Sequence, residues 1–144
     1  MEKSTKQSLK YILNMRPLLN KAALFSDGTE FYRTPAEPDP GDLVTIRFRT
    51  QRNNVDEVYL IHGEQRFQMK VEQPVHGYDY YAVTVPVEKE IYRYYFEIHY
   101  GWITFFYNFR GVSERAEEEH QFAIYPGYHV PKWARGAVMY QIFV

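Results

Sequence analysis

The chain has 144 residues, a formal net charge of −1 and no cysteine, and 18% of its residues are aromatic. This length suffices for one domain with a sizeable core but not for a complete barrel enzyme. The charge argues against a nucleic-acid partner, because such binding depends on neutralising phosphates, and the absence of cysteine excludes disulfides and thiolate sites. The aromatic content fits either a tyrosine-rich sandwich or a surface that stacks on flat ligands such as sugars.

Residues 1–19 are expected to form a leader that is either a short helix or disordered. Leu9, Ile12 and Leu13 have the spacing of one helix face, and Pro17 would end such a helix. The N-terminus lacks the apolar segment of a secretory signal, and no stretch approaches the roughly 20 apolar residues that span a membrane. The sequence therefore predicts a soluble protein with no membrane partner, cytoplasmic by default.

Short segments typical of strands begin near Lys21. Residues 22–26 and 30–34 flank Asp27-Gly28, a strong two-residue turn signal, and are predicted to form a hairpin. Residues 43–50 and 91–100 alternate apolar and polar side chains, the pattern of a strand with one wet face. Further strands are predicted at residues 55–61, 65–71, 78–85, 102–109 and 121–125, and the acidic residues 113–120 form a short helix or a loop.

Seven or eight short strands separated by turn signals are typical of an immunoglobulin-like β-sandwich. The predicted fold class is therefore all-β, with the sandwich at residues 20–129. Residues 130–144 are a separate segment, in which the sequence becomes almost wholly apolar from Ala137 on. Such a run is typical of a strand buried on both faces, although an antiparallel strand or a core helix segment fits it as well.

The sequence predicts no catalytic residue, no cofactor and no metal site. Its acidic residues lie mostly in turns or solvated segments, with no setting that indicates a raised pKa, and it contains neither a Gly-x-Ser-x-Gly elbow nor a phosphate loop. The five histidines fall in different elements and are not paired at ligand spacing. A calcium ion on turn oxygens of Asp27, Asp39 or Asp42 stays open, but nothing predicts it.

Alternation sends neighbouring aromatic residues to opposite faces of a strand, as for Tyr80 and Tyr81, so some must point away from the core. An exposed aromatic side chain can stack on a pyranose ring or pack against another chain. Trp102 at a hairpin start and Phe67 beside Arg66 are the strongest candidates for such outward platforms. Ordinary packing is the alternative for each of them.

The last segment contains a motif of higher specificity. Residues 131–143, PKWARGAVMYQIF, resemble the beginning of the catalytic barrel of the alpha-amylase superfamily, glycoside hydrolase family 13. The group with the greatest similarity comprises maltogenic amylases, neopullulanases and cyclomaltodextrinases. Residues 130–144 would then be a linker and the first strand of a missing (β/α)8 barrel, and the catalytic carboxylates of the family would lie beyond Val144.

Inner segments extend this resemblance to about residues 20–144. The stretches LVTIRFRT at 43–50, NNVDEV at 53–58, YDYY at 78–81 and YRYYF at 92–96 resemble the N-terminal domain of these enzymes, carbohydrate-binding module family 34. In that family the domain is a β-sandwich that often swaps across a dimer and narrows the partner's active-site cleft. Some relatives place an aromatic residue near the partner's substrate, and the matching segment here, residues 64–67, makes Phe67 the candidate, with Arg66 beside it.

The resemblance implies a non-catalytic N-terminal domain of a retaining glycosidase that hydrolyses α-1,4-glucosidic bonds in maltooligosaccharides, cyclodextrins, pullulan or starch. The implied partners are an α-glucan oligosaccharide or cyclodextrin, the protein's own catalytic barrel and a homodimer partner. The substrate-binding candidates are Phe67, Arg66 and Trp102. Two alternatives stay open: a freestanding glucan-binding module, and a purely structural domain that self-associates.

Overall fold

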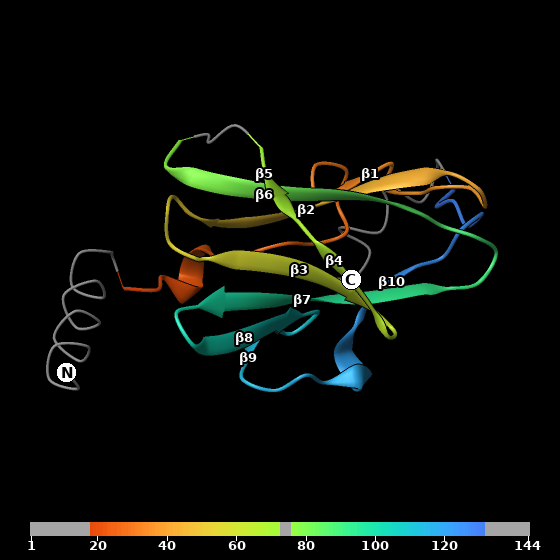
Figure 1. Cartoon of the computed structure of the whole chain (residues 1–144). Helices are drawn as coiled ribbons and strands as arrows, with labels where there is room; N and C mark the ends of the chain where they lie inside the picture. The colour runs from red at the N-terminus through yellow and green to blue at the C-terminus, as the bar shows by residue number, and fades with distance from the viewer. Residues whose placement is uncertain (1–17, 73–75, 132–144) are drawn as a thin grey trace, which may run out of the picture.

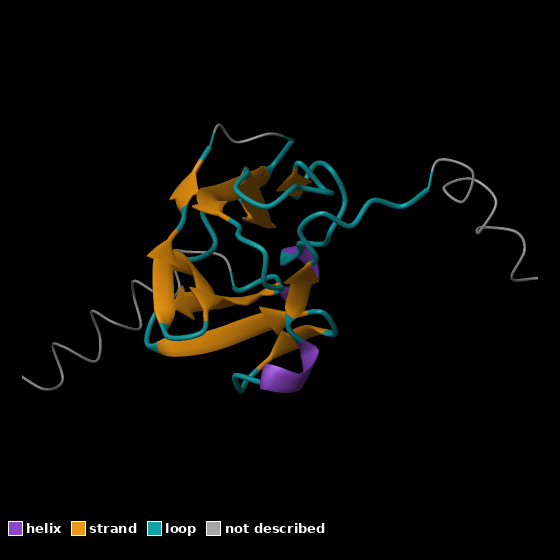
Figure 2. Ribbon diagram, turned by 90° about the vertical axis from the view of Figure 1, so that its right-hand side faces the viewer, coloured by secondary structure: helices purple, strands orange, loops and turns teal. Residues whose placement is uncertain are grey.

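Two antiparallel sheets face each other in the computed structural model, which describes residues 18–72 and 76–131 (Figures 1 and 2). The prediction of an all-β immunoglobulin-like sandwich is confirmed. Most of the expected leader and the expected barrel strand at residues 137–144 lie outside the described residues.

One sheet has four strands in the order β1 (Arg33–Thr34), β2 (Leu43–Gln51), β6 (Tyr78–Pro86) and β5 (Lys70–Val71). The other has the order β4 (Gln65–Gln68), β3 (Glu57–His62), β7 (Tyr92–Tyr100), β8 (Ile103–Asn108) and β9 (Gly111–Ser113), and β10 (Phe122–Ile124) also pairs with β7. Two short 3-10 helices, η1 (Lys21–Ala23) and η2 (Glu118–His120), lie outside the sheets.

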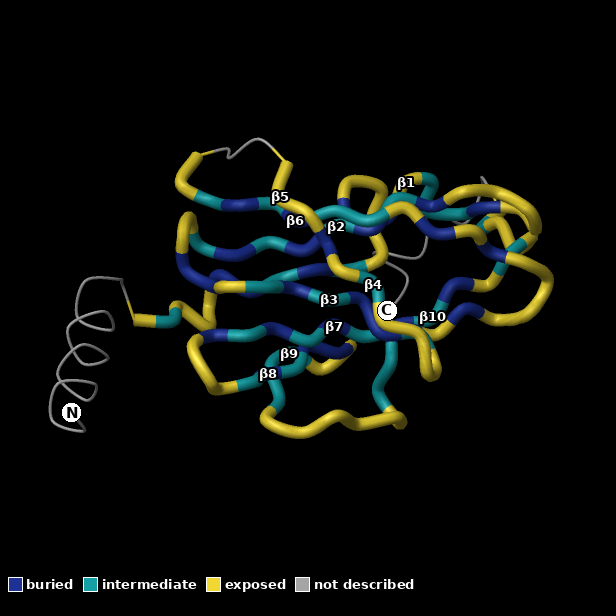
Figure 3. Tube along the Cα trace, in the orientation of Figure 1, coloured by how far each residue is buried: buried dark blue, intermediate teal, exposed yellow. Residues whose placement is uncertain are grey.

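Alternating side chains on β2 and β7 build the core between the sheets, as the sequence predicts. Ile46 and Phe48 on β2 and Tyr94 and Phe96 on β7 are fully buried, and the rings of Phe48 and Phe96 lie 4.7 Å apart. Figure 3 shows the same alternation as buried and half-buried positions along these strands. The neighbour of Tyr94, Tyr95, is only half-buried, so the two tyrosines lie on opposite faces.

The predicted hairpin of residues 22–26 and 30–34 is wrong. Asp27 accepts hydrogen bonds from the backbone nitrogen and the hydroxyl of Thr29, at 2.9 and 2.6 Å, and so closes a local turn with its own side chain. The two halves do not pair with each other. Phe25 bridges to Arg49 and β1 pairs with Thr45 and Ile46, so the whole segment lies along β2.

The single strand predicted at residues 65–71 divides between the two sheets. Its first part, β4, pairs with β3, while its last part, β5, pairs with β6 of the other sheet. Met69 lies at the crossing with 3% of its surface exposed, and its backbone nitrogen donates to the Val58 carbonyl at 2.8 Å. Figure 1 shows this run passing from one layer to the other. A buried apolar residue at the crossing thus ties both layers to one segment.

Candidate functional site

Arg66 is the centre of a polar cluster on the outer face of the six-stranded sheet. Its guanidinium carbon lies 3.8 Å from the centroid of the Tyr59 ring, within cation–π range. Its Nη2 donates to Glu97 Oε2 and lies 3.1 Å from His99 Nε2, which is itself 2.6 Å from Glu97 Oε2. We name these four residues, from strands β3, β4 and β7, the Arg66 cluster. Since His99 Nε2 either carries a proton or lacks one, it donates to Glu97 or accepts from Arg66, but not both.

The Arg66 cluster keeps its carboxylate charged. Burial raises the pKa of Glu97, but hydrogen bonds from His99 and Arg66, together with the charge of Arg66, bring the pKa below its ordinary value of 4.5. A carboxyl group held in this way is ionised at neutral pH. It therefore cannot serve as the general acid that glycoside hydrolysis requires.

Phe67 lies on the face opposite to Arg66, although the two are adjacent in sequence. Phe67 pairs with the fully buried Leu60 and packs, half-buried, against the core between the sheets. It lines a cavity of about 400 Å³ together with His62, Gln65, Pro86, Glu88, Glu90, Ile91 and Tyr92. The structure thus places the two candidate residues on different surfaces and does not combine them into one site.

An aromatic stack lines the Phe67 cavity, and one of its two residues has a buried hydroxyl without a partner in the described ranges. The rings of His62 and Tyr92 are stacked, with centroids 3.7 Å apart. The Tyr92 hydroxyl is buried and has no hydrogen-bond partner within the described ranges. Burial, with a smaller effect of Tyr94, raises the pKa of Tyr92 to about 12, so its phenol stays protonated at neutral pH. The cavity therefore combines aromatic walls with polar and acidic side chains, as small-molecule sites can.

Trp102 lies at the reversal between β7 and β8, where Gly101 adopts a φ of 62°. Its side chain is 71% exposed. Tyr92 of the Phe67 cavity lies at the other end of β7. The three residues singled out by sequence are therefore distributed over three places, and the role of each in substrate binding stays a prediction.

The fold and the sequence both have known relatives. Residues 40–128, more than half of the chain, match the family described as "Alpha amylase, N-terminal ig-like domain". The chain belongs to this family. Among solved structures, a cyclomaltodextrinase is similar to this Ig-like domain with a TM-score of 0.62 and 16% identity, over 78% of the chain. A maltogenic amylase from S. marinus is similar with a TM-score of 0.58 and 20% identity, over 77%. Identities this low show a shared fold.

The Ig-like domain corresponds to only a part of those enzymes. The match covers 21% of the cyclomaltodextrinase and 16% of the maltogenic amylase, so the chain spans about a fifth of the first and a sixth of the second. Within the described ranges, no group of three or more histidine and acidic side chains could hold a metal ion. Those ranges also hold no helix with the length and apolar character needed to cross a bilayer.

Sequence reasoning missed the partners of Arg66 although their pattern was visible. Glu97 and His99 are two residues apart on a strand with period two, which places both side chains on one face. The register that brings this face beside Tyr59 and Arg66 depends on the pairing of β3 with both β4 and β7. Alternation along the strand could therefore predict that Glu97 and His99 share a face, but not that Tyr59 and Arg66 lie beside them.

Proposed function

We propose that this Ig-like domain is the non-catalytic N-terminal part of an amylase-type glycosidase that hydrolyses α-1,4-glucosidic bonds. The observation that carries the proposal is the family match over residues 40–128. The motif at residues 131–143 supports it, because it resembles the beginning of an amylase barrel. The catalytic carboxylates would then belong to the domain that follows, and a cytoplasmic location is supported by the cysteine-free sequence.

The domain's own role in this proposal is to shape access to the substrate and to contact a second copy of the protein. Support comes from aromatic side chains that are not fully buried in the sandwich core. Phe67 is only partly buried beside a cavity of about 400 Å³, and Trp102 is 71% exposed. Aromatic faces of this kind stack on the apolar face of a sugar ring or pack against a partner.

Kinetics of the full-length protein test the shaping role. Phe67→Ala is expected to lower kcat/KM for β-cyclodextrin by about tenfold, which corresponds to one lost aromatic contact of ~1.4 kcal/mol. The decrease in kcat/KM for maltotriose should be smaller. Phe31→Ala is the matched control, because Phe31 is 51% exposed but lies in the segment along the other sheet. Equal losses on the ring and the short linear substrate would remove the shaping role while leaving the glycosidase proposal intact.

NMR spectroscopy of the 144-residue chain separates sugar binding from contact with a second copy. Titration with maltoheptaose and β-cyclodextrin, following backbone amides and the Trp102 indole, is expected to shift signals around Phe67 or Trp102. If no signal moves at millimolar sugar and the chain is a dimer by sedimentation, its contribution is the dimer contact alone. A chain that is monomeric and binds no sugar would contradict both parts of the proposed role.

A further inference from the structure

A second cavity, of about 480 Å³, lies away from Phe67 and contains a buried charge. Its walls include the aromatic side chains of Phe25, Tyr107, Phe109, Phe122 and Tyr125. Its polar side chains include those of Asp27, Arg33, Arg93 and Gln121. A volume of about 300–1,000 Å³ is the range of small-molecule sites. We call this space the Arg33 cavity.

Arg33 reaches this cavity because of its register on β1. It pairs with Ile46, whose side chain is fully buried, so the arginine occupies an inward-facing position on an edge strand and is only 9% exposed. Its Nη2 and Nε donate to the Tyr94 hydroxyl at 2.8 and 3.2 Å, and its guanidinium carbon lies 5.5 Å from the centroid of that ring. The side chain is therefore fixed between the two sheets.

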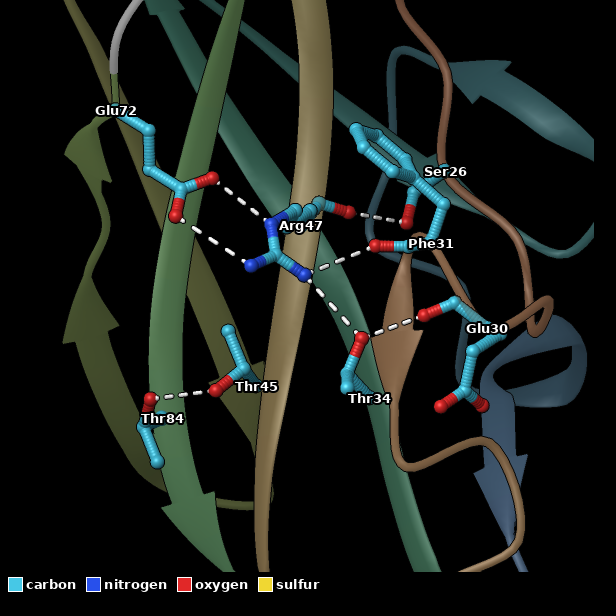
Figure 4. Close-up of polar contacts among 8 residues, drawn as sticks. All are labelled: Ser26, Glu30, Phe31, Thr34, Thr45, Arg47, Glu72 and Thr84. Atoms are coloured by element: carbon cyan, nitrogen blue, oxygen red, sulfur yellow. Dashed lines mark hydrogen bonds and ion pairs between the residues drawn. The ribbon is translucent and has the colours of Figure 1, made fainter.

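Contacts on the outer face of the four-stranded sheet hold the segment that carries Arg33 (Figure 4). Arg47 Nη1 donates to the Phe31 carbonyl at 3.0 Å and to Thr34 Oγ1 at 3.3 Å, and Arg47 Nε donates to Glu72 Oε1 at 2.8 Å. The Ser26 hydroxyl donates to the Arg47 carbonyl at 2.6 Å. These bonds fix both ends of the turn around Asp27, so the position of Arg33 is built into the fold.

The guanidinium of Arg33 is not in direct contact with a carboxylate of the described residues. It forms no ion pair with any carboxylate in residues 18–72 and 76–131. Burial raises the pKa of Tyr94 above its ordinary value, despite the opposing effect of Arg33, so the phenol that accepts the two bonds is neutral. Asp27 lines the same cavity and keeps its negative charge, but its Oδ1 accepts hydrogen bonds from Thr29 and its carboxylate forms no direct ion pair with Arg33. A buried charge that is not directly paired is unfavourable, so an anion that reached Arg33 would gain from the contact.

The other lining groups define what else the anion must carry. Arg93 adds a second, exposed guanidinium, so two positive charges face one negative charge in the cavity. Phe109 and Tyr125 are 75% and 52% exposed, which leaves aromatic surface for an apolar body. We propose that the Arg33 cavity binds a carboxylate attached to a small apolar group, with Arg33 as the main contact of the carboxylate. That group is either a free small molecule or a side chain of the longer protein that contains this domain.

Titration with benzoate tests the proposal directly. Benzoate added to the 144-residue chain is expected to shift the Arg33 Nε–H signal and the amides of Gly28 and Ala123, and benzamide, its neutral analogue, to bind at least about tenfold more weakly. Arg33→Met should weaken benzoate by about tenfold or more, and Arg93→Gln by less. Arg52→Gln is the matched control, because Arg52 is exposed and outside the cavity.

A second variant keeps the test decisive if Arg33→Met does not fold. Ala123→Leu places a larger side chain on the cavity wall without touching the Arg33 bonds, and should abolish benzoate binding. Binding to the 144-residue chain but not to the full-length protein would assign the carboxylate to the protein itself, whereas binding to both would assign it to a free ligand. Equal affinity for benzoate and benzamide, or unchanged benzoate affinity in both variants, would overturn the proposal. It does not depend on the parent's being a glycosidase.

Discussion

Arg66 and Arg33 deal with their positive charge in opposite ways. Arg66 lies on an outer face with about half of its side chain exposed, yet it has a carboxylate, an imidazole and an aromatic ring as partners. Arg33 lies between the sheets with 9% exposed, yet within the described residues the hydrogen bonds of its guanidinium go to a neutral phenol. Exposed pairs contribute little to stability because water and salt screen them, whereas a buried cation without an anion has much to gain from one. The Arg66 cluster thus supplies a carboxylate partner for its arginine, whereas the Arg33 cavity has no carboxylate in direct contact with its arginine among the described residues.

The largest expected change in the free energy of unfolding comes from a comparison of Tyr94, between the sheets, with Tyr95, on the outer face. Tyr94→Ala should lower the free energy of unfolding by about 3–5 kcal/mol, because it deletes a fully buried ring stacked on Phe122 at 5.3 Å. Tyr95→Ala, one residue away on the outer face, should cost about 1 kcal/mol or less. Urea unfolding followed by circular dichroism measures both. Similar losses for the two variants would show that the faces do not differ as described.

Removal of the Arg33 charge should change the free energy of unfolding by less. Whether the change is a loss depends on whether the Tyr94 hydroxyl is still present. Arg33→Met alone should destabilise the chain by about 1–3 kcal/mol, since it leaves a buried phenol without a partner. Adding Tyr94→Phe removes that phenol, so the double variant should return to within about 1 kcal/mol of the unsubstituted chain or exceed it. Urea unfolding in benzoate-free buffer gives both values. A double variant no more stable than Arg33→Met would mean that the loss comes from the removed arginine and not from the unpaired phenol.

The Arg66 cluster should reveal itself through pH. The pKa of Glu97 in the folded chain lies below 4.5, so this carboxylate stabilises the fold above that pH, and the contribution disappears as the pH falls through the folded-state pKa. The difference in unfolding free energy between the unsubstituted chain and Glu97→Gln should thus shrink from pH 7 to pH 3. Glu119→Gln, on the exposed helix η2, is the control and should show no such trend. A difference independent of pH would refute the coupling.

The smallest effect is expected for Arg66 itself. Arg66→Gln removes its charge from a side chain that is 49% exposed, and the midpoint of thermal unfolding should not change measurably in 0.15 M salt. Differential scanning calorimetry at low and moderate salt provides the comparison. A clear destabilisation that persists at moderate salt would place Arg66 closer to Arg33 in its importance for the fold.

Much of the sandwich could be predicted because the alternation of apolar and polar residues in its central strands predicts which side chains are buried. The alternation at Val44, Ile46 and Phe48 predicts which face is buried without any knowledge of the opposite sheet. The region of residues 22–34 could not be predicted in this way. Asp27-Gly28 has the composition of a hairpin turn, but the Asp27 side chain bonds to Thr29, and pairing with β2 replaces pairing between the two halves.

The candidate sites were harder to predict because they depend on long-range register. Alternation alone separates Arg66 from Phe67, but which face turns inward follows from the pairing with Leu60. Arg33 gives no local signal at all. An arginine between Tyr32 and Thr34 would ordinarily be solvated, and its burial results from contact with Tyr94, 61 residues further along the chain. Tertiary packing, rather than composition, creates that cavity.

The crossing at Met69 has a consequence for how the domain folds. Residues 65–71 form an edge of the six-stranded sheet through β4 and an edge of the four-stranded sheet through β5. Since one short run completes both layers, neither layer can reach its final pairing while the other is unformed. We therefore expect the sandwich to assemble and melt in a single cooperative step, without a species in which one sheet persists alone.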